Sequence, residues 1–111
     1  MLLPNATNAY IDNRKLTEYC LNLEHEEGKH KARVFAAALS ITSETYFVLK
    51  SAILEAILTQ DALLLKELSS GRLYQVDFEL VYLDKSALVR SGWIILKNED
   101  FPRLTTCFVL T

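Results

Sequence analysis

The chain has 111 residues, of which 50% are hydrophobic and 23% are charged, and its 12 basic and 14 acidic residues leave a net charge of -2. This length and apolar content exclude a wholly disordered chain and predict a single domain over residues 1–111. The net charge excludes a generally cationic protein that coats nucleic acid, but it leaves room for a local basic site.

The opening residues show no basic segment followed by a long apolar run, and no later stretch approaches the roughly 20 apolar residues of a membrane helix. We therefore expect a cytoplasmic protein that does not contact the membrane. Cys20 and Cys107 are too few for a disulfide scaffold and are expected to be reduced thiols. Their spacing from the histidines matches no ligand motif, so neither a metal nor another cofactor is expected.

The first half of the chain shows helical periodicity in three pieces. An apolar stripe over Leu16–Leu23 predicts a short first helix, and a second helix is predicted over Lys29–Leu39. Thr42 or Ser43 is expected to cap a third helix that ends near residues 59–60. The buried side of this third helix is predicted to carry Phe47, Lys50, Ile53, Leu54 and Ile57.

The second half alternates apolar and polar residues with the period of β-strands. Strands are predicted over Leu73–Tyr82, Ala87–Leu96 and Arg103–Leu110, and a further edge strand near residues 9–11 is weakly indicated. The apolar run over residues 61–68 fits a helix or a strand, and periodicity does not decide between them. The predicted class is α+β, with N-terminal helices packed on one face of a three- to four-stranded antiparallel sheet.

A tight turn at Asp84-Lys85 would fix the register of the first two of these strands. It would set Glu79 opposite Arg90 and Asp77 opposite Gly92, and it would bring Val76 beside Trp93 on the core side. In the last strand, strict alternation separates two sets of residues onto opposite faces. One set is Leu104, Thr106, Phe108 and Leu110, and the other is Arg103, Thr105, Cys107 and Val109.

The densest polar cluster runs from His25 to Arg33 and holds both histidines of the chain, His25 and His30, with the cations Lys29, Lys31 and Arg33. Cations in a first helical turn oppose the helix dipole unless an anion lies among them, so the cluster indicates a phosphate or carboxylate site. Histidines titrate near neutral pH, as proton-transfer groups must. The alternative is a solvated turn in which neighbouring glutamates neutralise the cations.

A second polar set crosses the predicted exposed face of the sheet and comprises Gln75, Asp77, Glu79, Arg90, Arg103 and Thr105. Arg90 and Arg103 could bind a phosphodiester in a bidentate manner, and Gly92 beside them would leave a gap for a ligand. The competing interpretation is an ordinary ion pair between Glu79 and Arg90 on a solvent face.

Two segments carry a family resemblance that spans nearly the whole chain. Residues 22–35 fit the pattern NxxHxxGxxKAxxF, and residues 100–110 fit DFPRLxTCxVL. These motifs resemble those of a small bacterial domain family of unknown function, whose members stand alone or end toxin-like and phage head-morphogenesis-like proteins. That context implies a distant similarity to the barnase/EndoU/colicin/RelE group of small ribonucleases, in which helices precede a curved antiparallel sheet that binds RNA.

The resemblance implies a metal-independent ribonuclease of toxin type. His25, His30, Lys31 and Asp77 are its expected catalytic residues, and Lys29, Arg33, Arg90, Arg103 and Thr105 its expected RNA-binding residues. The alternative is a non-catalytic interaction module of a toxin–antitoxin or phage-related system. It would bind a protein partner, or a second copy of itself, through the apolar side chains of Leu63, Leu64, Leu65 and Leu68.

Overall fold

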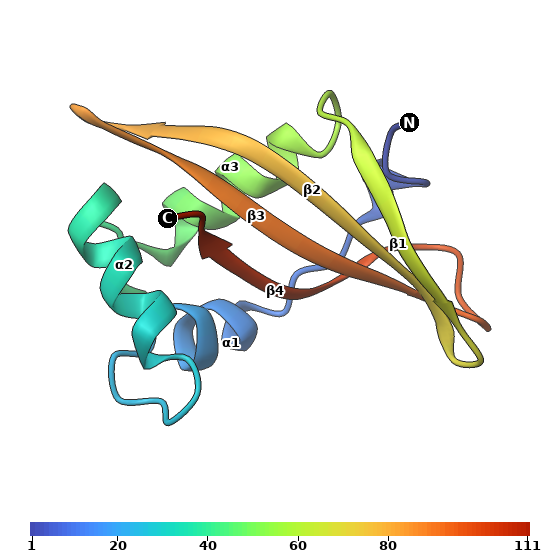
Figure 1. Cartoon of the computed structure of the whole chain (residues 1–111), viewed down its shortest axis with the longest axis horizontal. Helices are drawn as coiled ribbons and strands as arrows, with labels where there is room; N and C mark the ends of the chain where they lie inside the picture. Colours follow the sequence, from blue (N-terminus) through green and yellow to red (C-terminus); the bar gives the residue numbers. More distant parts are fainter.

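The computed structural model describes residues 1–111 as an N-terminal helical layer followed by a four-stranded antiparallel sheet in which each strand pairs with the next (Figure 1). The helix α3 runs behind the sheet in this view, and no helix covers the face toward the viewer. The predicted α+β class is therefore confirmed. The strands are β1 (Ala62–Leu68), β2 (Gly71–Tyr82), β3 (Lys85–Leu96) and β4 (Arg103–Val109), and the longer helices are α2 (Lys29–Leu39) and α3 (Tyr46–Ala56).

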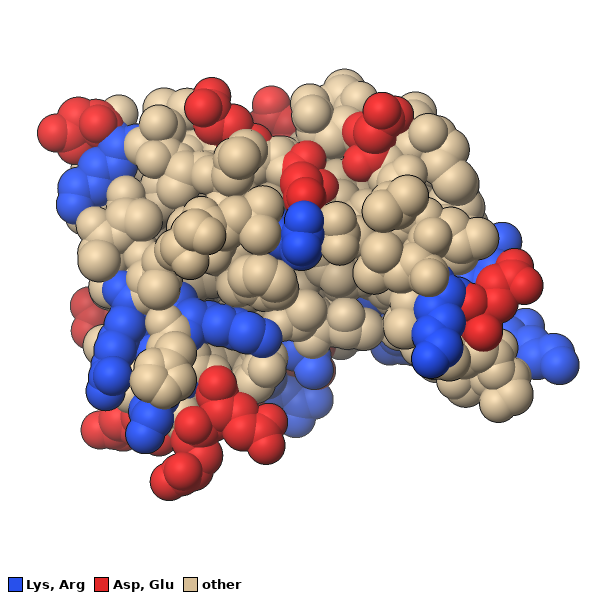
Figure 2. Space-filling model, viewed as in Figure 1, with Lys and Arg blue, Asp and Glu red and all other residues tan.

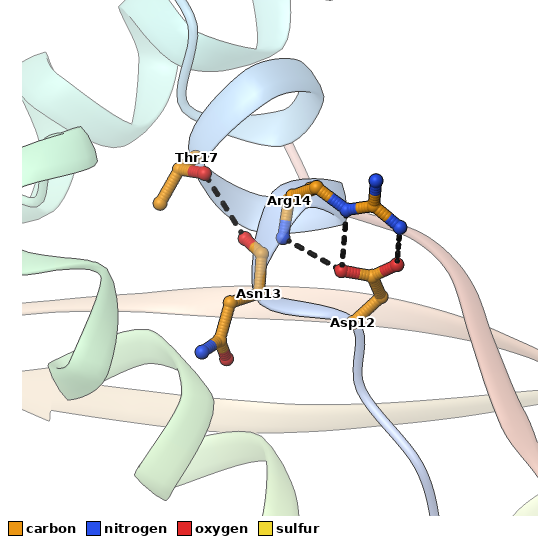
Figure 3. Close-up of polar contacts among 4 residues, drawn as sticks. All are labelled: Asp12, Asn13, Arg14 and Thr17. Atoms are coloured by element: carbon orange, nitrogen blue, oxygen red, sulfur yellow. Dashed lines mark hydrogen bonds and ion pairs between the residues drawn. The ribbon is translucent and has the colours of Figure 1, made fainter.

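The first helical segment begins at a capped turn, α1 (Asn13–Lys15), which continues into a π-helical turn, η2 (Leu16–Cys20). The Asp12 carboxylate accepts a hydrogen bond from the backbone N–H of Arg14 at 3.0 Å and pairs with the guanidinium of the same residue (Figure 3). The Thr17 hydroxyl donates to the carbonyl of Asn13 at 3.2 Å. Leu16 and Cys20 are buried as predicted, whereas Leu23 lies outside the helix and is exposed.

The helix α2 has the predicted bounds, and its apolar side chains Ala32, Phe35 and Leu39 are buried. Before α3, the Thr45 hydroxyl accepts a hydrogen bond from the Thr42 backbone N–H at 3.0 Å, which places Thr42 at the predicted cap. The buried side of α3 differs in part from the prediction. Leu49, Ile53 and Ile57 are buried at intervals of four residues, and this rotation leaves Phe47 exposed.

The segment that periodicity left open, residues 61–68, forms the edge strand β1 rather than a helix. It pairs with β2 from Ala62 opposite Val76 to Leu68 opposite Gly71, with a bulge at Leu65. The fourth strand of the sheet is thus β1, and the weakly indicated edge strand near residues 9–11 does not form. In its place Tyr10 makes one isolated parallel bridge to Arg103.

The turn between β2 and β3 lies at Leu83-Asp84, one residue earlier than predicted. Each cross-strand pair therefore moves by two residues, and the predicted pairing of Glu79 with Arg90 is wrong. Arg90 lies opposite Asp77 instead, and Gly92 lies opposite Gln75. A shift of two residues keeps every side chain on its predicted face, so the predicted core side of β2 is confirmed.

A bulge at Thr105 changes the face on which the residues of β4 lie. Leu104 pairs with Trp93, but Thr106 pairs with Gly92, so Thr105 is the extra residue between them. Cys107 and Val109 consequently join Leu104 in the core, and Thr106 and Phe108 turn to the open face. Strict alternation predicts instead that Leu104 shares a face with Thr106 and Phe108, and that Cys107 and Val109 lie on the other face. The bulge makes this prediction wrong.

The helices and the inner face of the sheet enclose one core cluster of 22 buried residues. Ser91, on β3, is its buried polar side chain, and its hydroxyl accepts from Trp93 Nε1 at 2.9 Å and donates to the carbonyl of Val76 at 2.8 Å. Tyr74, Phe78 and Trp93 are buried within this core. None of the helices combines the length and the apolar character needed to cross a membrane.

Candidate functional site

Lys31 is the centre of the candidate site, because its side chain reaches from α2 to β4. Its ammonium donates to the Tyr19 hydroxyl at 3.2 Å and to Thr106 Oγ1 at 3.2 Å. It also lies 5.3 Å from the centroid of the Tyr19 ring and 5.1 Å from that of Phe108. The ion pairs of the structure all join other residues, so this half-buried cation is held by neutral oxygens and ring faces.

Two local features of the backbone produce this contact. The bulge at Thr105 turns Thr106 and Phe108 toward the open face, where the beginning of α2 approaches β4. At the start of α2, Gly28 packs against the carbonyl oxygen of Tyr19 so closely that a Cβ atom would collide with it. A glycine at this position therefore lets α2 approach η2 and brings Lys31 to Tyr19.

His25 contacts the same tyrosine from the other side. Its ring meets the Tyr19 ring edge to face, with centroids 5.0 Å apart and planes at 83°. Its Nδ1 accepts hydrogen bonds from the backbone N–H groups of Glu27 at 3.0 Å and Gly28 at 2.9 Å. Nδ1 is thus occupied as an acceptor, and Nε2 carries the proton of the neutral ring. Beside it lies a hollow of about 480 Å³ that is lined by Asp12, Arg14, Lys15, Glu18, Tyr19 and His25.

The polar residues of the sheet reach this centre through Arg90. Its Nε and Nη2 atoms donate to the Asp77 carboxylate at 2.9 Å each, and this pairing raises the pKa of the guanidinium. With its side-chain amide turned so that the oxygen faces these donors, Gln75 accepts from both nitrogens at 3.2 Å. Arg90 is directly opposite Phe108 on the open face, and residues so paired have Cβ atoms about 5 Å apart. Phe108 therefore lies between Lys31 and the backbone of Arg90, while the Arg90 guanidinium is directed toward Asp77 on β2.

Other residues of the predicted site lie elsewhere. Arg103 donates to Glu99 at 2.8 Å through both Nε and Nη2, which raises the pKa of Arg103 and lowers that of Glu99. Its guanidinium also lies between the rings of Tyr10 and Phe101, at 5.2 and 4.8 Å from their centroids. Because Arg103 begins β4 and Phe108 lies near its end, this cation does not share the Lys31 centre.

The remaining predicted site residues of α2 are not held by the sheet. Lys29, His30 and Arg33 have no hydrogen bond or ion pair from their side chains, and His30 and Arg33 are exposed on the helix surface. The gap predicted beside Gly92 is not open. A Cβ atom at Gly92 would lie 3.0 Å from Thr105 Oγ1 and 3.1 Å from Thr106 Cγ2, so the two threonine side chains fill the space.

Three residues of this centre were missed by reasoning from the sequence. Tyr19 was assigned to the apolar stripe of the first helix, which its half-buried ring satisfies while its hydroxyl binds Lys31. Thr106 and Phe108 were assigned to the face opposite Arg103 and Thr105. The sequence carries no signal for the bulge that reverses this assignment.

The two cysteines lie behind the Lys31 centre. Cys20 follows Tyr19, and Cys107 lies between Thr106 and Phe108, and both are fully buried. Interaction with Cys20, together with burial, raises the pKa of Cys107 well above its ordinary value, whereas interaction with Cys107 lowers the pKa of Cys20. The two thiols thus belong to the packed contact between η2 and β4.

Charge is distributed unevenly over the open face. Figure 2 shows lysine and arginine side chains at the lower left, where η2 and the start of α2 lie in Figure 1, with acidic side chains of the adjacent loop below them. Along the upper edge, over β1 and β2, the charged side chains are mainly acidic. The net charge of -2 therefore combines a basic corner with an acidic edge.

Comparison with curated proteins and with solved structures finds no match for this chain. A family model described as a domain of unknown function, DUF6883, matches residues 2–111. The match covers every residue of the core cluster and of the Lys31 centre. The chain belongs to the DUF6883 family of domains of unknown function, as the resemblance of its motifs to a family without an established function led us to expect.

Proposed function

We propose that this domain is a metal-independent ribonuclease that binds the phosphodiester of RNA at Lys31. One observation carries the proposal: the Lys31 ammonium is half-buried at the open face, is positioned by two hydroxyl groups, and has no carboxylate partner. A half-buried cation without a counter-ion gains most from an anionic ligand. A phosphate group between the ammonium and the two hydroxyls would supply that charge.

Arg90, directly opposite Phe108 on β3, is the second cation that we assign to the centre. Cleavage without a metal requires positive groups near the phosphorus atom, because negative charge accumulates on its oxygens in the transition state. Asp77 and Gln75 hold the guanidinium in one orientation, so Asp77 acts as a positioning residue rather than as a base. Thr106 and Tyr19 would orient the phosphate through their hydroxyl groups.

The reaction also needs proton transfer. A base removes the proton of the ribose 2′-hydroxyl as its oxygen attacks phosphorus, and an acid protonates the 5′-oxygen that leaves. We assign the first role to His30, next to Lys31 in α2, and the second to the Lys31 ammonium. His25 has no free lone pair, because its Nδ1 accepts two backbone hydrogen bonds, so we assign it the role of donating its Nε2–H to a phosphate oxygen. Its contact with the Tyr19 ring holds it beside the centre.

Cleavage of a fluorescently quenched single-stranded RNA, in EDTA and at pH values from 5 to 8, tests the proposal. We expect Lys31→Ala and His25→Ala to lower the rate at least 100-fold, as loss of a charge-stabilising or proton-transferring group does. Lys66→Ala is the matched control, because Lys66 is an exposed lysine on β1, and it should leave the rate within twofold. Absence of cleavage by the wild-type chain across this range would refute the proposal.

The second candidate function is protein binding through β1. Leu63, Leu64, Leu65 and Leu68 are 40–58% exposed on this edge strand, which is unusual for four leucines in seven residues. The bulge at Leu65 and the charge of Lys66 disfavour direct pairing with another strand, so side chains would make the contact. Sedimentation at rising concentration tests self-association. A monomer at every concentration excludes it, whereas a dimer that dissociates in Leu63→Glu supports it.

A further inference from the structure

The strand β2 is longer than β1, and the difference leaves part of its outer edge without a neighbour. Pairing with β1 ends where Ala62 lies opposite Val76. Beyond this point, residues 77–82 pair only with β3, in a regular register without a bulge. Alternate backbone groups of these six residues therefore point away from β3, and no backbone hydrogen bond from a turn or loop reaches them.

A hollow of about 410 Å³ lies beneath this edge, between β2 and α3. On the helix side it is lined by Ala52 and Ala56, whose small side chains leave the space unfilled. On the strand side it is lined by Phe78 and Leu80. Six residues of a strand span about 20 Å, so the free edge of residues 77–82 can pair with an extended segment of about six residues.

The charges around the hollow are of one sign. Glu55 and Glu79 line it and are both exposed, and neither takes part in an ion pair. No lysine or arginine lines it. Figure 2 shows acidic side chains along the same edge of the molecule. Val81, which is 66% exposed, adds an apolar side chain on the solvent side. A segment that fits here has to be both basic and apolar.

We propose that an extended segment of a partner protein, with apolar and basic residues in alternation, adds to β2 as a strand in line with β1. Its backbone would pair with the free edge of residues 77–82, antiparallel to β2. Its apolar side chains would enter the hollow over Ala52 and Ala56, and its basic side chains would face Glu79. The alternation follows from the two-residue period of a strand.

Apart from Asp77, whose carboxylate holds Arg90, this docking edge is separate from the Lys31 centre. It lies on the β2 side of the sheet, whereas Lys31 contacts β4, which is two strands away in the order of the sheet. It also differs from the free edge of β1, where a bulge and Lys66 oppose strand addition. The inference therefore does not depend on the proposed ribonuclease activity.

Amide NMR spectra recorded during titration with an acetylated eight-residue peptide of alternating valine and lysine test the proposal. We expect shifts confined to the amides of residues 77–82 and of the neighbouring part of α3, with saturation below about 2 mM. A peptide of alternating valine and glutamate should bind at least 10-fold more weakly. No shifts at 2 mM, or shifts centred on other residues, would overturn the inference.

Charge-reversed variants provide the matched control. Glu79→Lys should weaken binding of the valine–lysine peptide at least 5-fold, whereas Glu67→Lys, at an exposed glutamate on β1, should leave it within twofold. The same spectra report whether each variant is folded. If Glu67→Lys weakens binding as much as Glu79→Lys, the attraction is non-specific and the docking edge is refuted. Concentration-dependent shifts of residues 77–82 without peptide would identify a second copy as the occupant and would overturn the partner segment.

Discussion

Replacement of Ser91 by alanine tests whether the single buried polar side chain of the core is required for the Trp93 contact. Ser91 is 0% exposed, and its hydroxyl both accepts from Trp93 Nε1 at 2.9 Å and donates to the carbonyl of Val76 at 2.8 Å. In Ser91→Ala the indole N–H has no partner and no access to water. An unsatisfied buried donor costs about 1–3 kcal/mol, and the lost bond to Val76 adds about 1 kcal/mol.

We therefore expect Ser91→Ala to lower the free energy of unfolding by about 2–4 kcal/mol, which is a large share of the ~5–15 kcal/mol of a typical domain. Urea denaturation followed by fluorescence measures this directly, because Trp93 is the only tryptophan in the chain. Ser86→Ala, at an exposed serine of the same strand, is the control and should change stability by less than about 0.5 kcal/mol.

A double-mutant cycle identifies the cause of the loss. Phenylalanine at position 93 removes the N–H donor, so in the Trp93→Phe background Ser91→Ala should cost only about 1 kcal/mol, measured by circular dichroism. If Ser91→Ala costs less than about 0.5 kcal/mol in the wild-type background, or costs the same in both backgrounds, the hydrogen bond from Trp93 does not account for the buried serine.

Three further predictions follow from local geometry. Leu83 begins the β2–β3 turn with a φ of 56°, which strains a residue that has a side chain, and it is exposed. Leu83→Gly should therefore raise the free energy of unfolding by about 1 kcal/mol in urea denaturation. An unchanged or lower value would contradict backbone strain at this turn. Gly28→Ala places a Cβ atom against the Tyr19 carbonyl oxygen and should lower the melting temperature by several degrees. An unchanged melting temperature would contradict this close approach of α2 to η2. Arg103 lowers the pKa of Glu99 in the folded state, so the stabilisation by this pair is complete above the unfolded pKa and is lost as the pH falls through the folded pKa. In Glu99→Gln the free energy of unfolding should therefore fall less steeply than in the wild type as the pH is lowered below 4.5. Identical dependence on pH in the two proteins would contradict the pairing.

The amino-acid sequence was sufficient to predict the class of the fold and the face on which most side chains lie. The period of 3.6 residues placed α2 at its observed bounds, and the period of two identified β2, β3 and β4 with the buried side of β2. These features depend on neighbouring residues along the chain, which share one helix face or one side of a strand. The cluster of His25, Lys31 and nearby cations was recognisable for the same reason.

Tertiary structure decided the register, the bulges and hence the site. A turn at Leu83-Asp84 put Asp77, and not Glu79, opposite Arg90, and a bulge at Thr105 turned Thr106 and Phe108 toward Lys31. Both depend on how distant segments pack, because a strand accepts an extra residue wherever the core on one face and the pairing on the other are best satisfied. The residues that carry charge were thus evident from the sequence, whereas the side chains that surround Lys31 were brought together only by the packing of α2 against β4.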